Sequence, residues 1–228
     1  ISKSSQVGIS KIALSMEPSV IRDMYFRAGI GQVTGLGFPG ESAGALPNRT
    51  KWHPIEQATF AYGYGLSVNA VQLAQAYSVI ASGGVFNSAK LIMQDDPQPG
   101  QRVVDQKFVS QVTDMLKEVV KPGGTATRAD LEDYIVAGKT GTAHKVKKEG
   151  YADDKYVALF AGFAPADNPE IVSVVIINEP PSEGGYSGGK AAAPVFAQAM
   201  GKALKLLRVP PAHKADGELV ASAKEGQF

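Results

Sequence analysis

Three candidate strands follow one another in the second half of the chain, after a region of helical patterns. They cover residues 133–143, 155–164 and 170–178, and the turn Pro122-Gly123-Gly124 precedes the first of them. The turn sequence Asp167-Asn168-Pro169 separates the last two strands and predicts a hairpin between them. Helix-rich, strand-rich and helical segments succeed one another without an internal repeat. This order predicts one α+β domain.

Two helices with recognisable ends are expected before the strands. Residues 18–29 are predicted to form a helix, with Pro18 in its first turn and Gly29 beyond its end. Asn69 is a predicted N-cap, because Gln72 stands three residues later and an apolar face follows. The pair Gly83-Gly84 is expected to stop this second helix. A partly helical apolar pattern also begins almost at the first residue.

Two more helices are expected further along the chain. Asp105 is the predicted N-cap of one, and the final helix is expected to start at about Pro194. The apolar face after Asp105 consists of Phe108, Val109, Val112, Met115, Leu116 and Val119. The glycine- and proline-rich residues 29–50 are expected to form a loop. The predicted domain covers residues 1–209, and the polar segment 210–228 is expected to be a mobile tail.

Composition excludes several classes of protein. Of 228 residues, 44% are hydrophobic and 20% are charged, which is typical of a globular protein. The net charge of +1 implies no general attraction to nucleic acid. The chain has no cysteine, which excludes disulfides and thiol catalysis. Its three histidines lack the spacing of metal ligands, so a zinc site is not expected. No cofactor is indicated by the sequence.

The first predicted strand ends in the sequence Val-Ala-Gly-Lys-Thr-Gly-Thr-Ala, residues 136–143. Alternate strand residues face opposite sides, so Thr140 and Thr142 share one side and Lys139 takes the other. Gly141 lacks a side chain and lets a ligand backbone approach closely. Such an edge can bind an extended peptide through main-chain hydrogen bonds and a carboxylate through the paired hydroxyls.

Two other motifs compete for the chemistry. The G-x-G-x-x-G match at Gly35–Gly40 follows no predicted strand, so loop glycines are the favoured interpretation. The G-x-S-x-G match at Gly185–Gly189 centres on Ser187, but residues 178–184 separate it from the preceding strand. Ser187-x-x-Lys190 is also the one Ser-x-x-Lys of the chain. Its two central glycines disfavour a helical turn, so a glycine-rich loop is expected there.

Several segments match one known family in the same order along the chain. They are residues 1–11, 34–41, 62–67, 137–143, 160–166 and 193–196, beginning with Ile-Ser-Lys-Ser-Ser-Gln-Val-Gly-Ile-Ser-Lys. The chain resembles the transpeptidase domain of class B penicillin-binding proteins, most closely the septal, division-specific group of Gram-negative bacteria. Lys-Thr-Gly is one of the signatures of that family and its β-lactamase relatives. The resemblance implies an antiparallel sheet with helices on its faces.

The resemblance also implies catalytic roles. Ser4 would relay a proton between the nucleophile, the leaving amine and the incoming amine, and Gln6 stands where the family usually has asparagine. Because its amide lies one methylene further out, Gln6 either bends to restore the contact or weakens acylation. Lys139 would keep Ser4 poised, and the backbone N–H of Thr142 would be one donor of the oxyanion hole.

Substrate contacts are implied for seven residues. They are Thr140, Gly141, Thr142, Tyr64, Tyr151, Tyr186 and His144. The threonine hydroxyls would hold the carboxylate of a stem peptide or β-lactam, while the strand pairs with the peptide by β-augmentation. Each tyrosine is equally compatible with a packed aromatic residue, and a solvated strand-end histidine is the favoured interpretation of His144.

The implied function is that of a peptidoglycan D,D-transpeptidase in septal cell-wall synthesis. In the family, the nucleophile and its base lie in a Ser-x-x-Lys upstream of Ser4, so this chain is expected to be the C-terminal portion of the domain and inactive alone. The implied partners are peptidoglycan stem peptides, β-lactams and cell-division proteins, without nucleic acid. The parent would be anchored by an upstream membrane helix at the periplasmic face of the inner membrane. Alternatives are a non-catalytic peptidoglycan-binding pseudoenzyme or scaffold, and a serine hydrolase using Ser187.

Overall fold

The computed structural model describes residues 1–95, 98–147, 150–211, 213–215 and 218–220. They form two compact units. The sheet unit comprises Ile1–Lys3 together with the chain from Gln111 onward, and the helical unit comprises Ser4–Ser110. Helix α5 (Gln106–Lys117) carries the chain from the helical unit into the sheet unit.

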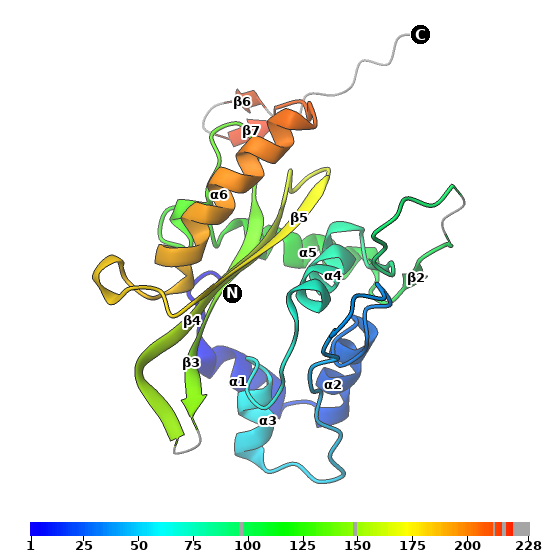
Figure 1. Cartoon of the computed structure of the whole chain (residues 1–228), viewed down its shortest axis with the longest axis vertical. Helices are drawn as coiled ribbons and strands as arrows, with labels where there is room; N and C mark the ends of the chain where they lie inside the picture. The colour runs from blue at the N-terminus through cyan, green and yellow to red at the C-terminus, as the bar shows by residue number, and fades with distance from the viewer. Residues whose placement is uncertain (96–97, 148–149, 212, 216–217, 221–228) are drawn as a thin grey trace. The chain divides into compact units, whose positions relative to one another are not determined.

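The sheet unit contains a three-stranded antiparallel sheet in the order β3-β4-β5 (Figure 1). Its strands are β3 (Ala137–Lys147), β4 (Gly150–Ala164) and β5 (Ile171–Asn178). The register pairs Thr142 with Ala158, and it shifts between His144 and Val146. The predicted α+β class and the hairpin between the last two strands are therefore confirmed. The first strand starts later than residue 133 and runs further, to residue 147.

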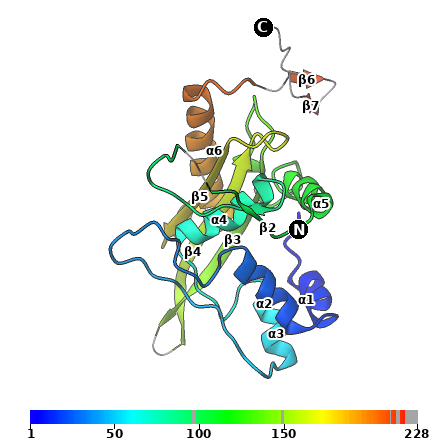
Figure 2. The same cartoon turned by 90° about the vertical axis from the view of Figure 1, so that its right-hand side faces the viewer.

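Helix α6 (Gly188–Leu206) lies against this sheet (Figure 1; Figure 2). Its buried side chains join those of the strands in one hydrophobic core. The rings of Phe160 on β4 and Phe196 on α6 meet edge to face, with centroids 4.7 Å apart. The short 3₁₀ turn η1 (Thr127–Ala129) adds buried Ala129 to the same core.

The start of α6 differs from the sequence expectation, which placed it at about Pro194 after a glycine-rich loop. The helix begins six residues earlier, at Gly188, with Ser187 as its N-cap. A Cβ atom on Gly188 would lie 2.2 Å from the Leu159 carbonyl oxygen, and one on Gly189 would lie 2.1 Å from that of Thr125. Only glycine allows the first turn to approach β4 and the Thr125 backbone so closely. This tertiary requirement outweighs the low helix propensity of glycine.

Pro194 consequently lies inside α6. Proline has no N–H, so the carbonyl of Lys190 one turn earlier receives no helical hydrogen bond from it. Arg128 of η1 donates to this carbonyl instead, with 3.4 Å between Nη1 and the oxygen. The interruption is thus compensated by a side chain from a neighbouring element.

The helical unit is built from short helices and a two-residue β-pair. Its elements are α1 (Gln6–Leu14), α2 (Pro18–Arg27), α3 (Pro54–Phe60), α4 (Ala70–Ala81), β1 (Val85–Phe86) and β2 (Gln101–Arg102). The expected helices α2 and α4 are confirmed. Pro18 lies in the first turn of α2, and Gly83 and Gly84 follow the end of α4. Asp105 caps α5 as predicted, since its Oδ1 accepts the N–H of Lys107 at 2.9 Å.

Gln72 joins the N-terminus of α4 to the loop formed by residues 29–50. It is fully buried and forms the predicted capping box with Asn69, each side chain accepting the backbone N–H of the other residue. Its Nε2 also donates to the carbonyls of Gln32 and Ala43, at 2.6 and 2.8 Å. The Gln72 side chain therefore provides hydrogen-bond partners for three backbone groups, the N–H of Asn69 and the carbonyls of Gln32 and Ala43. Without it, these groups would be shielded from water and lack a partner.

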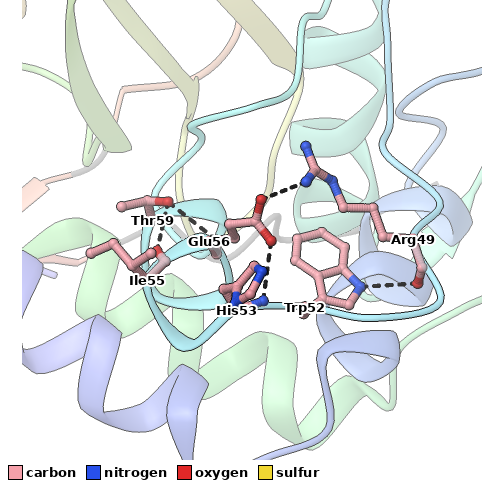
Figure 3. A network of polar contacts seen from close by, with 6 residues as sticks. All are labelled: Arg49, Trp52, His53, Ile55, Glu56 and Thr59. Atoms are coloured by element: carbon pink, nitrogen blue, oxygen red, sulfur yellow. Dashed lines mark hydrogen bonds and ion pairs between the residues drawn. The ribbon is translucent and has the colours of Figure 1, made fainter.

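Helix α3 was not expected from the sequence. Its N-terminus is held by Glu56, whose two carboxylate oxygens accept from Arg49 and from the backbone N–H of His53 (Figure 3). Trp52 donates from its indole N–H to the carbonyl of Arg49 at 3.2 Å, and its ring packs on Phe60. This network connects an otherwise irregular loop to a helix of seven residues.

Apolar side chains of two helices are less buried than their patterns suggest. On α5, Val109 and Leu116 are buried, but Phe108 and Met115 of the same predicted face are exposed. Helix α1 is apolar on more than one side, because Val7 and Leu14 lie seven residues apart on one side and Ile12 lies on another. These three α1 side chains are exposed.

The predicted tail from residue 210 falls largely outside the described residues. Within it, β6 (His213–Ala215) pairs antiparallel with β7 (Glu218–Val220). In the described parts of the chain, no helix combines the length and the apolar character needed to cross a membrane.

Candidate active site

Strand β3 carries Lys139 in a half-buried position. Its Nζ donates to Oγ1 of Thr140 at 3.0 Å and to the Thr140 carbonyl at 3.1 Å. The side chains of neighbouring strand residues leave from opposite sides, as predicted, but the long Lys139 side chain brings its ammonium back to the Thr140 hydroxyl. Burial lowers the pKa of Lys139 below the usual 10.5.

The Thr140 hydroxyl belongs to a short polar chain. Besides the Lys139 ammonium, it contacts Oγ1 of Thr125 at 3.1 Å, and either hydroxyl can donate. An ammonium has no acceptor, so Thr140 accepts from Lys139 and its own proton is available for Thr125 or for a ligand. Thr125 follows the Pro-Gly-Gly turn directly, and this turn therefore delivers a third hydroxyl to the motif.

The Thr142 hydroxyl is oriented by helix α6. Its Oγ1 accepts the backbone N–H of Gly188, in the first turn of α6, at 3.0 Å. Since this bond uses a lone pair, the hydroxyl proton remains available to donate to an anion. The positive end of the α6 dipole lies at the same place and favours negative charge there. The geometry is compatible with carboxylate recognition, while the role of the Thr142 N–H in an oxyanion hole stays a prediction.

Three aromatic rings follow one another beyond Thr142. His144 and Tyr156 are cross-strand partners whose ring centroids lie 4.3 Å apart. The Tyr156 ring stacks in parallel on that of Tyr186, with 3.8 Å between centroids. His144 is exposed and also packs on a neighbouring ring, a contact that the expectation of a solvated strand-end histidine did not include. Tyr186 keeps 42% of its surface exposed, so it is not a core residue.

The other two predicted tyrosines are Tyr64 and Tyr151. Tyr64 belongs to the helical unit, where its ring meets that of Tyr62 edge to face at 5.5 Å. Tyr151 lies on β4, but its side chain is outside the described residues. Contacts of these two residues with substrate therefore remain predictions.

Ser4 lies where the two units join along the chain. Lys3 belongs to the sheet unit and donates from Nζ to the Gly123 carbonyl at 2.5 Å, whereas Ser5 is the N-cap of α1 in the helical unit. Ser4 itself has a φ of 52°, a left-handed conformation that is uncommon outside glycine. Gln6 is the first residue of α1 and is exposed. Strained backbone of this kind occurs preferentially at functional sites.

Sequence reasoning did not identify Thr125, Tyr156 or the N–H of Gly188 as parts of the site. The register of the predicted hairpin could have suggested Tyr156, since it lies opposite His144. The other two come from distant segments and carry no local signal. Among the described residues, no group of three or more His, Cys, Asp or Glu side chains could hold a metal ion.

Comparison with known families identifies this arrangement. A family model described as the penicillin binding protein transpeptidase domain matches residues 1–201. The chain belongs to the penicillin-binding protein transpeptidase family. The predicted resemblance and the predicted fold are thereby confirmed.

Individual relatives of this transpeptidase chain agree with that assignment. It is 43% identical to peptidoglycan D,D-transpeptidase FtsI of Escherichia coli K12 and 41% identical to the probable peptidoglycan D,D-transpeptidase PenA of Neisseria gonorrhoeae. Each match covers 92% of this chain but only 36% of the relative's length.

A solved structure provides a similar match. The transpeptidase domain of penicillin-binding protein 3 from Burkholderia pseudomallei, in its apo form, is 44% identical, with a TM-score of 0.87. The match covers 94% of this chain and 65% of that one. The penicillin-binding transpeptidase fold is therefore shared, and this chain corresponds to about two thirds of that domain chain.

Proposed function

We propose that this chain is the part of a peptidoglycan D,D-transpeptidase that binds the carboxylate end of the acyl donor. The supporting observation is the geometry of β3, where one ammonium and three hydroxyls are brought together. Thr140 and Thr142 present hydroxyl protons, and the Lys139 charge lies beside Thr140. A carboxylate bound at this edge would accept charge-assisted hydrogen bonds.

In the proposed reaction, a serine supplied by the rest of the parent attacks the carbonyl of the penultimate D-Ala of a stem peptide. The new bond is an ester, the terminal D-Ala leaves, and its amine takes the proton that Ser4 relays. An amine of a second stem peptide then attacks the ester, loses a proton through the same relay, and restores the serine. As a cation, Lys139 would favour the ionised form of Ser4 and so keep the relay poised.

The parent protein with fluorescent penicillin tests this proposal. Wild-type parent should be labelled, and Lys139→Ala should slow labelling by about 10²- to 10⁴-fold, the usual contribution of a proton-transfer group. Lys202→Ala, an exposed lysine of α6, is the matched control and should label like wild type. The present chain without the rest of the domain should take no label.

Three results would count against the proposal. Penicillin labelling of the chain alone would show that the nucleophile lies within it. Labelling of the chain by a fluorophosphonate, lost in Ser187→Ala, would favour a serine hydrolase with Ser187 in an elbow. A wild-type parent that retains peptidoglycan but takes no penicillin would favour the pseudoenzyme or scaffold.

We also propose the cellular setting by relationship to the FtsI proteins. The parent would work in septal cell-wall synthesis at the periplasmic face of the inner membrane, with cell-division proteins as partners. Its ligands would be peptidoglycan stem peptides and β-lactams.

A further inference from the structure

Glu179, the residue after β5, has an unusual conformation for its type. Its φ of 52° lies in the left-handed region, where non-glycine residues are rare unless neighbouring contacts fix them. Its backbone N–H donates to the carbonyl of Tyr156 at 2.8 Å, which continues the β4–β5 hydrogen bonding by one residue. The backbone is therefore held against β4 while the chain direction changes.

The Glu179 side chain bridges the other two strands. Its carboxylate accepts from Lys145 of β3 at 2.5 Å and from Lys155 of β4 at 2.8 Å. These hydrogen bonds, first that of Lys145 and then that of Lys155, lower the pKa of Glu179 to about 2. The interaction is thus complete above the ordinary pKa of 4.5 and is lost as the pH falls through about 2. Lys145 lies at the register shift of β3, where the strand is least constrained by pairing.

The segment from Glu179 to Gly188, here termed the strap, returns to β3 at its other end. Tyr186 stacks on Tyr156, and the N–H of Gly188 binds the Thr142 hydroxyl. A Cβ on Gly188 would lie 2.6 Å from the Gly141 carbonyl oxygen, so this end fits closely against the strand. Both ends of the strap are therefore attached to β3, on either side of His144.

We propose that Glu179 is a positioning residue for the carboxylate-binding edge of β3. By fixing one end of the strap to Lys145 and Lys155, it holds the Gly188 N–H in place at the other end. That N–H orients the Thr142 hydroxyl toward the acyl donor. The inference rests on the proposed function for the identity of this ligand, but the mechanical connection from Glu179 to Thr142 is independent of it.

A purely local ion pair would behave differently. Exposed pairs contribute little to folding, and loss of the Glu179 charge would then loosen only the end of β5. A positioning role requires in addition that residues around Thr142 and Gly188 respond, although the carboxylate of Glu179 binds the two lysines and not these residues. A local ion pair therefore predicts a response only at the end of β5, whereas a positioning role predicts a response around Thr142 and Gly188 as well.

The first test uses hydrogen exchange of this chain at neutral pH, with Glu179→Gln. Peptides covering 139–145 and 183–189 should exchange about two- to fivefold faster, which matches the strength of an exposed charge network. A peptide covering 196–206 of α6 should not change. Glu170→Gln removes the exposed carboxylate at the other end of β5 and is the matched control. Faster exchange confined to residues 176–179 would overturn the proposal.

The second test measures acylation of the parent by a penicillin. Glu179→Gln should raise the penicillin concentration for half-maximal acylation about two- to fivefold. The maximal acylation rate should stay nearly unchanged, because the substitution weakens binding of the ligand carboxylate and leaves the acylation step intact. Lys145→Gln should have a similar effect, and the double variant should be no worse than either single one. Additive effects, or a lowered maximal rate alone, would contradict the proposal.

The two tests separate the two proposals. A wild-type parent that takes no penicillin would refute the function and leave the exchange result to decide the role of Glu179. Normal acylation of wild type together with unchanged exchange in Glu179→Gln would refute the positioning role alone. Far-UV circular dichroism shows whether the Glu179→Gln variant folds. Glu179→Asp, which keeps the carboxylate on a shorter side chain, should bring the exchange rate near Thr142 part of the way back to the wild-type value.

Discussion

Lys139 brings a charged group into a half-buried position with hydroxyl and carbonyl oxygens of the next residue as acceptors. Burial favours its neutral form, and the pKa is lowered for that reason. A lysine of this kind exchanges protons more readily than one at the surface, and such perturbed lysines occur often at functional sites. The same burial has a cost for folding. This cost is present at pH values below the folded pKa and declines as the pH rises from there towards 10.5.

We therefore predict that Lys139 loses its proton with a midpoint below pH 10.5. The measurement is a titration of ¹³C-methylated lysines in this chain by nuclear magnetic resonance, and the signal absent from Lys139→Arg identifies the residue. A midpoint at or above 10.5 would contradict the burial argument. Unfolding the chain in urea should return the same signal to the ordinary value, because desolvation is the cause.

Among the elements, α4 shows how strongly one buried polar side chain can tie a helix to a loop. Gln72→Leu keeps the approximate size of the side chain but leaves the carbonyls of Gln32 and Ala43 and the N–H of Asn69 without their partner. We expect the free energy of unfolding to fall by about 2–4 kcal/mol, the range for several unsatisfied buried groups. Urea denaturation measures this change.

The control for that prediction is Gln106→Leu, which makes the same substitution at an exposed glutamine of the helical unit, the first residue of α5. It should alter the stability by less than about 0.5 kcal/mol, as is usual away from buried networks. Equal effects of the two substitutions would show that the buried hydrogen bonds of Gln72 are not responsible.

Elements with local signals could be predicted from the sequence, and those fixed by distant contacts could not. The ends of α2 and α4 depend on Pro18, Asn69 and the glycines after each helix, all within a few residues. The start of α6 depends instead on the space left by Leu159 and Thr125, which no local pattern reveals. For this reason the sequence suggested a loop where the helix begins.

The candidate site likewise combines residues that a local motif predicts with residues that only distant contacts bring into place. Lys139, Thr140 and Thr142 form a contiguous motif on a predicted strand, so their grouping could be foreseen. Their partners Thr125 and Gly188 arrive from other segments through packing. The roles of Ser4, Gln6 and the three tyrosines came from family resemblance and remain predictions.

The molecule as a whole contains two compact units, and each has buried residues of its own. The single tryptophan, Trp52, lies in the helical unit and packs on Phe60, so its fluorescence reports that unit. Phe196→Ala in the sheet unit should lower the stability of that unit by about 3–5 kcal/mol. We predict that the urea transition followed by Trp52 fluorescence stays in place, while hydrogen exchange of residues 196–206 becomes faster.

The reciprocal variant is Val79→Ala, which shortens a buried side chain of α4. It should move the Trp52 transition to lower urea and leave exchange in residues 196–206 unchanged. A shift of the Trp52 transition by Phe196→Ala that equals the loss in the sheet unit would show that the two units unfold as one.

The exposed apolar side chains of α1 affect the solubility of the isolated chain and its tendency to associate. A helix with hydrophobic residues around most of its circumference is typical of a domain interior, yet Val7, Ile12 and Leu14 face solvent here. An exposed apolar surface of this kind promotes association between copies. We therefore expect the chain to stay monomeric most readily at low concentration, in mild detergent, or when a second polypeptide covers α1.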